Sequence, residues 1–213
     1  MSRPVPKPSP PLNPSARPPA RIVLIGPPAA GKTTVGRMLS EKLDVSMRDT
    51  DAMLVAKWGT IGDLFLVYGE DGFRDLERQT VDDAIQELVR RPGVVSLGGG
   101  AILHPDTRAQ LKHPSVIVVL IDIDAETVAT RINNNSRPLL NSESATALDR
   151  WRAIVKERTP LYHEVASVTV TASNAPPGAV VSRILEAIAS VHTKSYLQDL
   201  AREPEQTPRT ENQ

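Results

Sequence analysis

The stretch at 21–39, RIVLIGPPAAGKTTVGRML, restricts the possible folds of this chain more than any other segment. The apolar run at 21–25 predicts a buried strand, Gly26 and a proline end it, and a helical pattern begins near Lys32. The letters GPPAAGKT fit the pattern G-x-x-x-x-G-K-[ST], which joins a strand to a helix. The sequence therefore predicts a phosphate-binding loop in the context that such a loop requires.

The chemistry of this loop follows from its backbone. Gly26 permits a sharp turn, after which successive N–H groups point into one concavity that suits phosphate oxygens. The following helix adds its positive N-terminal end. Lys32 is placed to reach the β- and γ-phosphates of a nucleotide, and the Thr33 hydroxyl is placed to bind Mg²⁺. The alternative is a glycine–proline turn with a solvated lysine.

Composition excludes several other classes of function. Among the 213 residues, Lys and Arg total 25 and Asp and Glu total 25, which argues against a nucleic-acid-binding protein that relies on bulk charge. Aromatic residues make up 3% and cysteine is absent, so neither base-stacking platforms nor thiolate metal sites are expected. No apolar run approaches the about 20 residues of a membrane helix. We expect a cytoplasmic monomer that binds neither nucleic acid nor membrane.

The middle of the chain alternates between two patterns. Apolar runs rich in Val and Ile lie at 21–25, 94–97, 116–121 and 167–171. Helical patterns lie at 32–43, 70–90, 124–131, 145–158 and 178–192. Strands that alternate with helices predict a parallel sheet in an α/β sandwich, with ligands bound at the carboxyl ends of the strands.

The two ends differ from this middle part. Residues 1–19 hold 8 of the 19 prolines and no acidic residue, which predicts a disordered arm. A transit peptide is the weaker alternative, because so much proline prevents an amphipathic helix. The polar segment at 199–213 is expected to be a loose tail. Between them, 20–192 is predicted to form one domain.

Two charged segments follow the loop. MRDTDAML places Asp49 and Asp51 two residues apart at the end of a short predicted strand, where alternation puts both carboxylates on one face. They suit a Mg²⁺ shell and a substrate hydroxyl, or an Asp-rich turn that caps the next helix. In GEDGFRDLERQ, Arg74, Glu77 and Arg78 share one helix face, which is either a binding surface or a solvated charged face.

Three later segments complete a candidate site. The strand in GVVSLGGGAIL ends in glycines at 98–100, which permit close approach of a ligand or simply form a flexible turn. RINNNSRPLLNSES carries Arg137 and suits a mobile lid over phosphates. ERTPLYH places Arg158 shortly before Pro160, which is expected to end its helix. Arginines and the glycine backbone suit a carboxylate, and Asp51 suits an alcohol, so the residues predict phosphoryl transfer to a small anionic molecule.

Over roughly residues 20–192 the chain resembles the shikimate kinase family. The resemblance rests on the motifs GPPAAGKTTVGR, DTD, GFRDLE, LGGGA, RPLL and RTPLY, which occur in the family's order. It implies a P-loop kinase fold, in which a five-stranded parallel sheet forms the middle layer of a three-layer αβα sandwich. It also implies transfer of the ATP γ-phosphoryl group to the 3-hydroxyl of shikimate, a step of aromatic amino-acid biosynthesis.

Matching positions in the family imply roles for individual residues. Lys32, Asp51 and Arg137 look like the catalytic residues, with Asp51 on the reacting hydroxyl and Arg137 on the lid. Thr33 looks like the Mg²⁺ ligand, and Asp49 like the carboxylate that holds the water shell of the metal. The expected ATP-binding residues are Ala29, Ala30, Gly31, Lys32, Thr33, Thr34 and Arg137.

The resemblance also implies where the substrate binds. Arg74, Gly99 and Arg158 look like the site for the substrate carboxylate, to which Asp51 adds the hydroxyl contact. The substrate-binding region is expected at about 51–80, and the lid at about 132–144.

Some positions depart from the family. Ala29 stands where many members have glycine, so the backbone there must tolerate a Cβ. Arg131 precedes the lid arginine by six residues, out of the usual register, and is assigned no role. TASNAPPGAVV shares the Pro-Gly of the family's adenine-side loop but lacks the arginine often found there. The alternatives are a related small-molecule kinase, such as a gluconokinase, and a non-catalytic relative with a regulatory role.

Overall fold

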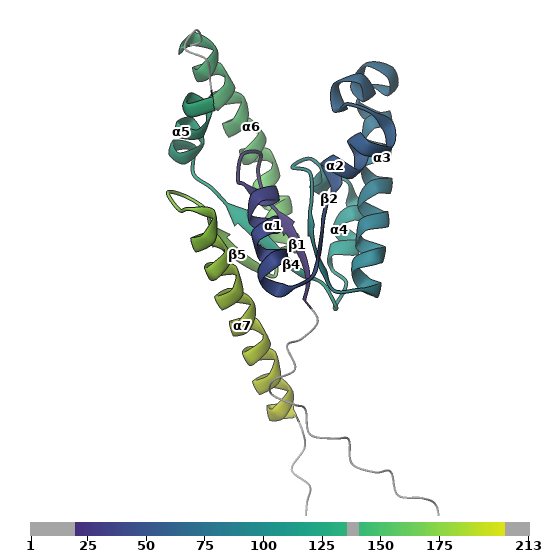
Figure 1. Cartoon of the computed structure of the whole chain (residues 1–213), viewed down its shortest axis with the longest axis vertical. Helices are drawn as coiled ribbons and strands as arrows, with labels where there is room; N and C mark the ends of the chain where they lie inside the picture. Colours follow the sequence, from purple (N-terminus) through teal and green to yellow (C-terminus); the bar gives the residue numbers. More distant parts are fainter. Residues whose placement is uncertain (1–19, 136–140, 203–213) are drawn as a thin grey trace, which may run out of the picture.

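The computed structural model describes residues 20–135 and 141–202 and shows an α/β protein built on one parallel sheet (Figure 1). The sheet contains β1 (Arg21–Ile25), β2 (Ser46–Asp49), β3 (Gly93–Ser96), β4 (Ile117–Asp122) and β5 (Val168–Thr171). Their order across the sheet is β2-β3-β1-β4-β5, and every neighbouring pair is parallel. Parallel neighbours need crossover connections, which explains the alternation of strands and helices in the sequence.

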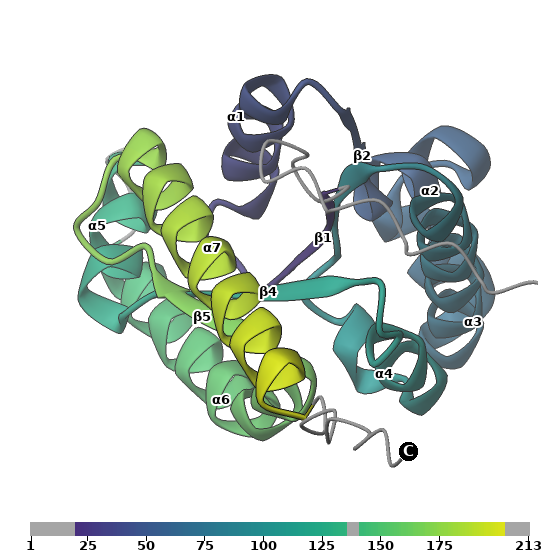
Figure 2. The same cartoon turned by 90° about the horizontal axis from the view of Figure 1, so that it is seen from below.

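Helices cover both faces of this sheet. They are α1 (Lys32–Leu43), α2 (Thr50–Trp58), α3 (Ile61–Arg90), α4 (Pro105–Leu111), α5 (Ala125–Asn135), α6 (Asn141–Val165) and α7 (Pro177–Arg202), with a short 3₁₀ turn, η1 (Ala101–Leu103). Figure 2 shows α1 and α7 on one side of the sheet and α3 and α4 on the other, while α6 contributes side chains to the cores on both sides. The predicted three-layer αβα sandwich with a five-stranded parallel sheet is therefore confirmed.

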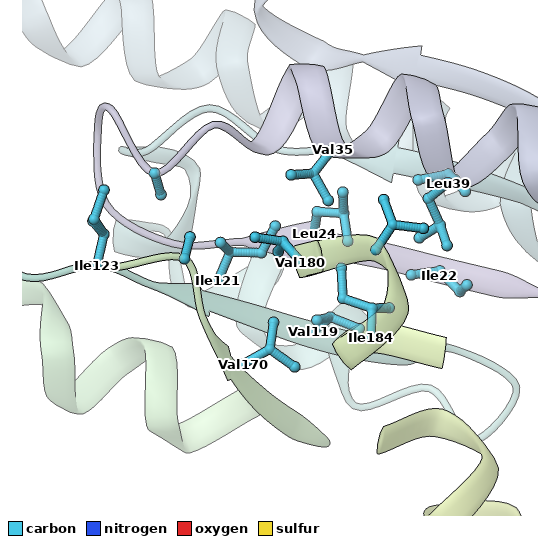
Figure 3. Close-up of a cluster of buried hydrophobic side chains, with 14 of the residues drawn as sticks. Ile22, Leu24, Val35, Leu39, Val119, Ile121, Ile123, Val170, Val180 and Ile184 are labelled. Carbon is cyan, nitrogen blue, oxygen red and sulfur yellow. The ribbon is translucent and has the colours of Figure 1, made fainter. Parts of the chain in front are cut away.

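The first core lies between the sheet and helices α1 and α7. In β1, Ile22 and Leu24 point to this side and pack with Val35 of α1 and Ile184 of α7 (Figure 3). All four side chains are buried. Burial of an aliphatic side chain of this size contributes about 1.5–3 kcal/mol, so the apolar positions of the predicted helices hold these two helices on the sheet.

The second core lies on the opposite face. Val23 and Ile25 of β1 alternate with the residues of the first core and pack with Val81 and Leu88 of α3. Tyr162 of α6 joins the same cluster. Because both faces of β1 are buried, its sequence is a continuous apolar run and shows no polar alternation, as is typical of a central parallel strand.

A small separate cluster holds the tip formed by α2 and the first part of α3. Leu54, Leu64 and Phe73 are its buried members. Gly69 interrupts the helical geometry of α3 with φ 68°, which allows the chain to bend before the long second part of the helix. Leu66, in the first part, is 86% exposed. In Figure 1 this tip rises above the sheet opposite the ends of α5 and α6.

Two features of the fold differ from the sequence prediction or fall outside it. The helix predicted to end before Pro160 continues through it to Val165, because Tyr162 and Val165 bury their side chains in the second core. The lid predicted at about 132–144 includes 136–140, which lie outside the described residues. Within 20–135 and 141–202, no helix has the length and apolar content needed to cross a membrane.

Candidate active site

The phosphate-binding loop joins β1 to α1 at the carboxyl edge of the sheet. Gly26 has φ 145°, and a Cβ there would overlap the carbonyl of Ile121. Gly31 has φ 87° at the start of α1, and Ala29 adopts the left-handed region with φ 65°. Among the described residues, no side chain caps α1, and its first turn contains no acidic residue. The N–H groups at this helix end are therefore available to an anion.

Lys32 extends back over this loop from the first turn of α1. Its Nζ donates to Gly26 O at 2.8 Å and to Pro27 O at 3.0 Å. Burial of the ammonium lowers the pKa of Lys32 to about 8, although the charges of Asp51 and Asp49 act to raise it. The lysine is thus held at the loop, with a weakened affinity for its proton until another anion arrives.

Asp49 connects the loop to α2. Its Oδ2 accepts a hydrogen bond from Thr33 Oγ1 at 2.6 Å, while its Oδ1 accepts one from Ala52 N at 3.1 Å and so caps α2. Asp51 lies in the first turn of that helix and not in extended chain. The prediction that strand alternation places both carboxylates on one face is therefore wrong. Both nevertheless act on the ammonium of Lys32.

The carboxyl group of Asp51 packs against the glycine loop. A Cβ at Gly98 would overlap Asp51 Oδ1, so glycine is needed there for close approach and not for flexibility. Partial burial raises the pKa of Asp51, the neighbouring charge of Asp49 raises it further, and Lys32 opposes both effects. Asp51 is consequently a stronger proton acceptor than an ordinary aspartate.

Arg74 is held one helix turn from Glu77. Its Nη1 donates to Glu77 Oε2 at 2.7 Å, and Glu77 is only 5% exposed. Burial raises the pKa of Glu77, and the hydrogen bond from Arg74 counteracts this rise. A Cβ at Gly100 would overlap the Arg74 guanidinium. The pair therefore lies against the glycine loop, and the alternative of a solvated charged face is wrong for Arg74 and Glu77.

Helix α6 contacts the same glycine loop from the other side. Arg158 Nη1 donates to Gly99 O at 3.0 Å, and the Tyr162 hydroxyl donates to the same oxygen at 2.8 Å. Arg158 Nε is buried and has no hydrogen-bond acceptor among the described residues. Burial raises the pKa of Tyr162 to about 12, so the phenol stays a donor at neutral pH. Tyr162 was not predicted as a site residue.

These elements enclose a cavity of about 490 Å³. Its lining consists of Pro28, Ala29, Gly31, Lys32, Thr33, Thr34, Asp51, Ser96, Leu97, Gly99, Gly100 and Arg158. The cavity brings together most of the residues that the sequence analysis singled out. Arg74 adjoins it at Gly100, whereas Arg137 lies outside the described residues.

A second cavity of about 400 Å³ lies on the other side of the phosphate loop. Its lining consists of Ala29, Ala30, Gly31, Thr34, Val35, Arg131, Ala172, Ala175, Pro177 and Val180. Arg131 Nη1 donates to Ala29 O at 2.6 Å, and its Nη2 reaches Ala172 O at 3.5 Å. Arg131, to which sequence reasoning assigned no role, thus joins the phosphate loop to the chain that follows β5.

The oxygen atoms beside the loop suit a magnesium ion. The Thr33 hydroxyl and the Asp49 carboxylate are already within hydrogen-bond distance of each other, and oxygen is the donor type that Mg²⁺ prefers. In the described part of the chain, no three His, Cys, Asp or Glu side chains gather into a metal site. An ion here would therefore take its other ligands from water and nucleotide phosphates, as Mg²⁺ commonly does.

A phosphate loop, a carboxylate beside its lysine and an arginine-lined cavity at the carboxyl edge of a parallel sheet define a P-loop phosphotransferase for small anionic molecules. The family model described as shikimate kinase matches residues 28–189. The chain belongs to the shikimate kinase family, and the predicted family, fold and kinase class are confirmed.

Individual relatives agree with this assignment. The chain is 44% identical over 165 residues to the shikimate kinase of Thermobifida fusca, covering 76% of this chain and 90% of that protein. It is 38% identical to that of Rhodococcus jostii, covering 79% and 98%. The shikimate kinase of Acinetobacter baumannii in complex with shikimate superposes with a TM-score of 0.69 at 36% identity, covering 79% and 92%. A gluconokinase from Sinorhizobium meliloti has a TM-score of 0.59 at 19% identity, which shows the fold alone.

Proposed function

We propose that the protein transfers the γ-phosphoryl group of ATP to the 3-hydroxyl of shikimate and releases ADP and shikimate 3-phosphate. The observation that carries this proposal is the shared cavity in which Lys32 and Asp51 lie beside Gly99 and Arg158. Phosphate-binding and carboxylate-binding groups therefore face the same space. The similarity to a shikimate kinase in complex with shikimate supports the same substrate.

The carboxylate of shikimate is bound by Arg74 and Arg158, together with the Gly99 backbone. Arg74 is pre-oriented by Glu77, and Arg158 by Gly99 O. The buried Nε of Arg158 still lacks an acceptor among the described residues, and a carboxylate oxygen would supply one. Charge-assisted hydrogen bonds to a carboxylate are about twice as strong as neutral ones, which favours an anionic substrate at this end of the cavity.

Asp51 orients the reacting hydroxyl at the other end. Its raised pKa makes it able to accept the hydroxyl proton as the phosphoryl group arrives. In a loose transition state the proton leaves late, so orientation is the first contribution of Asp51 and proton acceptance the second. Lys32 moves from the loop carbonyls to the transferring phosphoryl group and neutralises its charge.

Thr33 and Asp49 would hold Mg²⁺, directly and through water respectively. When bound, the ion supplies positive charge to the β- and γ-phosphate oxygens. Arg137, assigned to the lid by the family resemblance, would add a further positive charge. The proposed mechanism needs no residue from a second copy, so we propose that the protein acts as a monomer, and we place the reaction in the cytoplasm, which supplies ATP.

The test measures ADP release with ATP and Mg²⁺ over a panel of shikimate, quinate, gluconate and nucleoside monophosphates. We expect turnover with shikimate and at most weak turnover with the others. The Asp51→Asn variant is the control, since it keeps the fold and removes the proton acceptor. Preferential turnover of gluconate would replace this proposal with the gluconokinase alternative, and no turnover with any acceptor would favour the non-catalytic one.

A further inference from the structure

Four consecutive carbonyl groups of the phosphate loop, from Gly26 to Ala29, are bound by side chains. Lys32 Nζ donates to Gly26 O and Pro27 O. Trp151 Nε1 donates to Pro28 O at 2.9 Å, and Arg131 Nη1 donates to Ala29 O at 2.6 Å. A trans peptide group holds its C=O and N–H in opposite directions. Because residues 27 and 28 are prolines without an N–H, the contact that directs an unpaired loop N–H is the one from Trp151 to Pro28 O, whose peptide group carries the Ala29 N–H.

Ala29 is the residue of the loop for which such holding matters most. Its φ of 65° lies in the left-handed region, which glycine adopts freely and alanine disfavours. Gly26 and Gly31, which also have positive φ, meet this requirement by being glycine. Ala29 does not, so other contacts must keep its backbone in place.

The two carbonyls on either side of the Ala29 Cα are held from two different elements. Pro28 O, in the peptide group before it, is bound by Trp151 of α6, and Ala29 O, in the peptide group after it, by Arg131 of α5. Trp151 is 8% exposed and packs in the first core, so its indole has a fixed position. Among the described residues the Ala29 N–H donates to no acceptor, which leaves it available for a phosphate oxygen.

We propose that Trp151 is a positioning residue of the phosphate site. Together with Arg131 it keeps Ala29 in the left-handed conformation, and thereby keeps the Ala29 N–H directed at the bound phosphates. The hydrogen bonds from Trp151 and Arg131 thus stabilise a backbone conformation that glycine would adopt at this position without support. This inference rests on the proposed function in one respect, namely that nucleotide phosphates occupy this loop.

The test is a double-mutant cycle of Trp151→Phe and Ala29→Gly. The affinity for ADP is measured by calorimetry, and KM is measured separately for ATP and for shikimate. With alanine at 29, loss of the indole N–H should weaken ADP binding and raise the KM for ATP about three- to tenfold, the range expected for one hydrogen bond. The KM for shikimate should change less than twofold.

With glycine at 29 the same Trp151→Phe change should weaken ADP binding less than twofold, because glycine needs no support in this conformation. A purely structural role of Trp151 in the core would show equal effects in both backgrounds. Equal effects, or an equal loss of shikimate and ADP binding, would overturn the proposal. Trp58→Phe, which removes the other tryptophan, is the matched control and should leave ADP affinity unchanged.

If Trp151→Phe does not fold, Trp151→Tyr gives the same comparison in the two backgrounds, because it keeps an aromatic ring in the core and displaces the donor. The outcomes also separate this proposal from the proposed function. If the protein phosphorylates shikimate but glycine at 29 does not rescue ADP binding in the Trp151 variant, the positioning role alone is overturned. If glycine at 29 does rescue ADP binding but the protein does not phosphorylate shikimate, the positioning role is supported and the proposed substrate is contradicted.

Discussion

Lys32 illustrates at the scale of one residue how the site is prepared for an anion. Its ammonium donates to two backbone carbonyls of the loop, which stabilise it less than a phosphate would. Burial lowers its pKa to about 8, well below the usual value of about 10.4 for lysine. The free protein therefore binds this proton weakly. A bound phosphate raises the proton affinity of Lys32, because it places a negative charge nearby.

Proton uptake should accompany nucleotide binding above pH 8. Free protein loses the Lys32 proton as pH rises through about 8, whereas the ADP complex, with a higher pKa, retains it. Calorimetry at pH 8.5 in two buffers of different ionisation enthalpy measures this uptake. Lys32→Arg should abolish it, because arginine stays protonated throughout. Equal apparent enthalpies for the wild type in the two buffers would contradict this prediction.

Asp51 should set the acid limb of the pH dependence of kcat/KM. The reaction needs the ionised carboxylate, and burial together with Asp49 raises the pKa of Asp51, so activity should fall at a pH above the usual aspartate pKa of about 3.9. Asp49→Asn should move this limb to lower pH, since it removes one of the charges that raise the pKa. An acid limb that stays in place in Asp49→Asn would show that another group controls it.

At the scale of elements, the loop between β3 and η1 explains the glycine triplet. The side chains of Asp51 and Arg74 approach Gly98 and Gly100 so closely that a Cβ would overlap each of them. Gly99 instead offers its carbonyl to Arg158 and Tyr162. The loop is therefore a surface against which functional side chains are aligned.

Gly100→Ala should displace the Arg74 guanidinium and weaken shikimate binding by about 2 kcal/mol, because a charged contact to the substrate carboxylate is lost. The KM for ATP should change little. Gly62→Ala is a matched control, since a Cβ there would meet no atom within 4 Å. Separate titrations of shikimate and ADP measure both effects. Unchanged shikimate affinity in Gly100→Ala would show that Arg74 does not contact the substrate.

Elements also show where sequence reasoning succeeds and fails. The loop before α1 and the central strands were predictable, because the motif and the continuous apolar runs are local signals. Pro160 was misread, because a local rule about proline gives way to the burial of Tyr162 and Val165. Trp151 was missed because its partner, Pro28, is 123 residues away, and no pattern in the sequence reports such a contact.

At the scale of the whole molecule, the site is assembled from two sides of the glycine loop. Arg74 comes from α3 and Arg158 from α6, and hydrogen bonds to Glu77 and to Gly99 O hold them in place. Helix α6 also contacts the phosphate loop through Trp151. One helix therefore contacts both loops, and on the proposed function it would set the relative position of the two substrates.

Arg74→Ala and Arg158→Ala should each weaken shikimate binding by about 2–4 kcal/mol, because the remaining groups face an underpaired anion. ADP binding should change much less. The double variant should lose less than the sum of the two single losses, since both arginines act on one carboxylate. Titration of each ligand into the three variants tests this. Equal losses of shikimate and ADP affinity would place these arginines in the nucleotide site or in the structure.

The positions of the two tryptophans have an optical consequence. Trp151 donates its indole N–H to the phosphate loop, whereas Trp58 packs beside the cluster at the tip of α2 and α3, under the ammonium of Lys57 at 4.2 Å. The two natural fluorophores thus lie in different surroundings, one against the phosphate loop and one at the tip of α2 and α3. With Trp58 replaced by phenylalanine, all tryptophan emission would come from the indole that touches the phosphate loop, so nucleotide arrival becomes readable without an added dye.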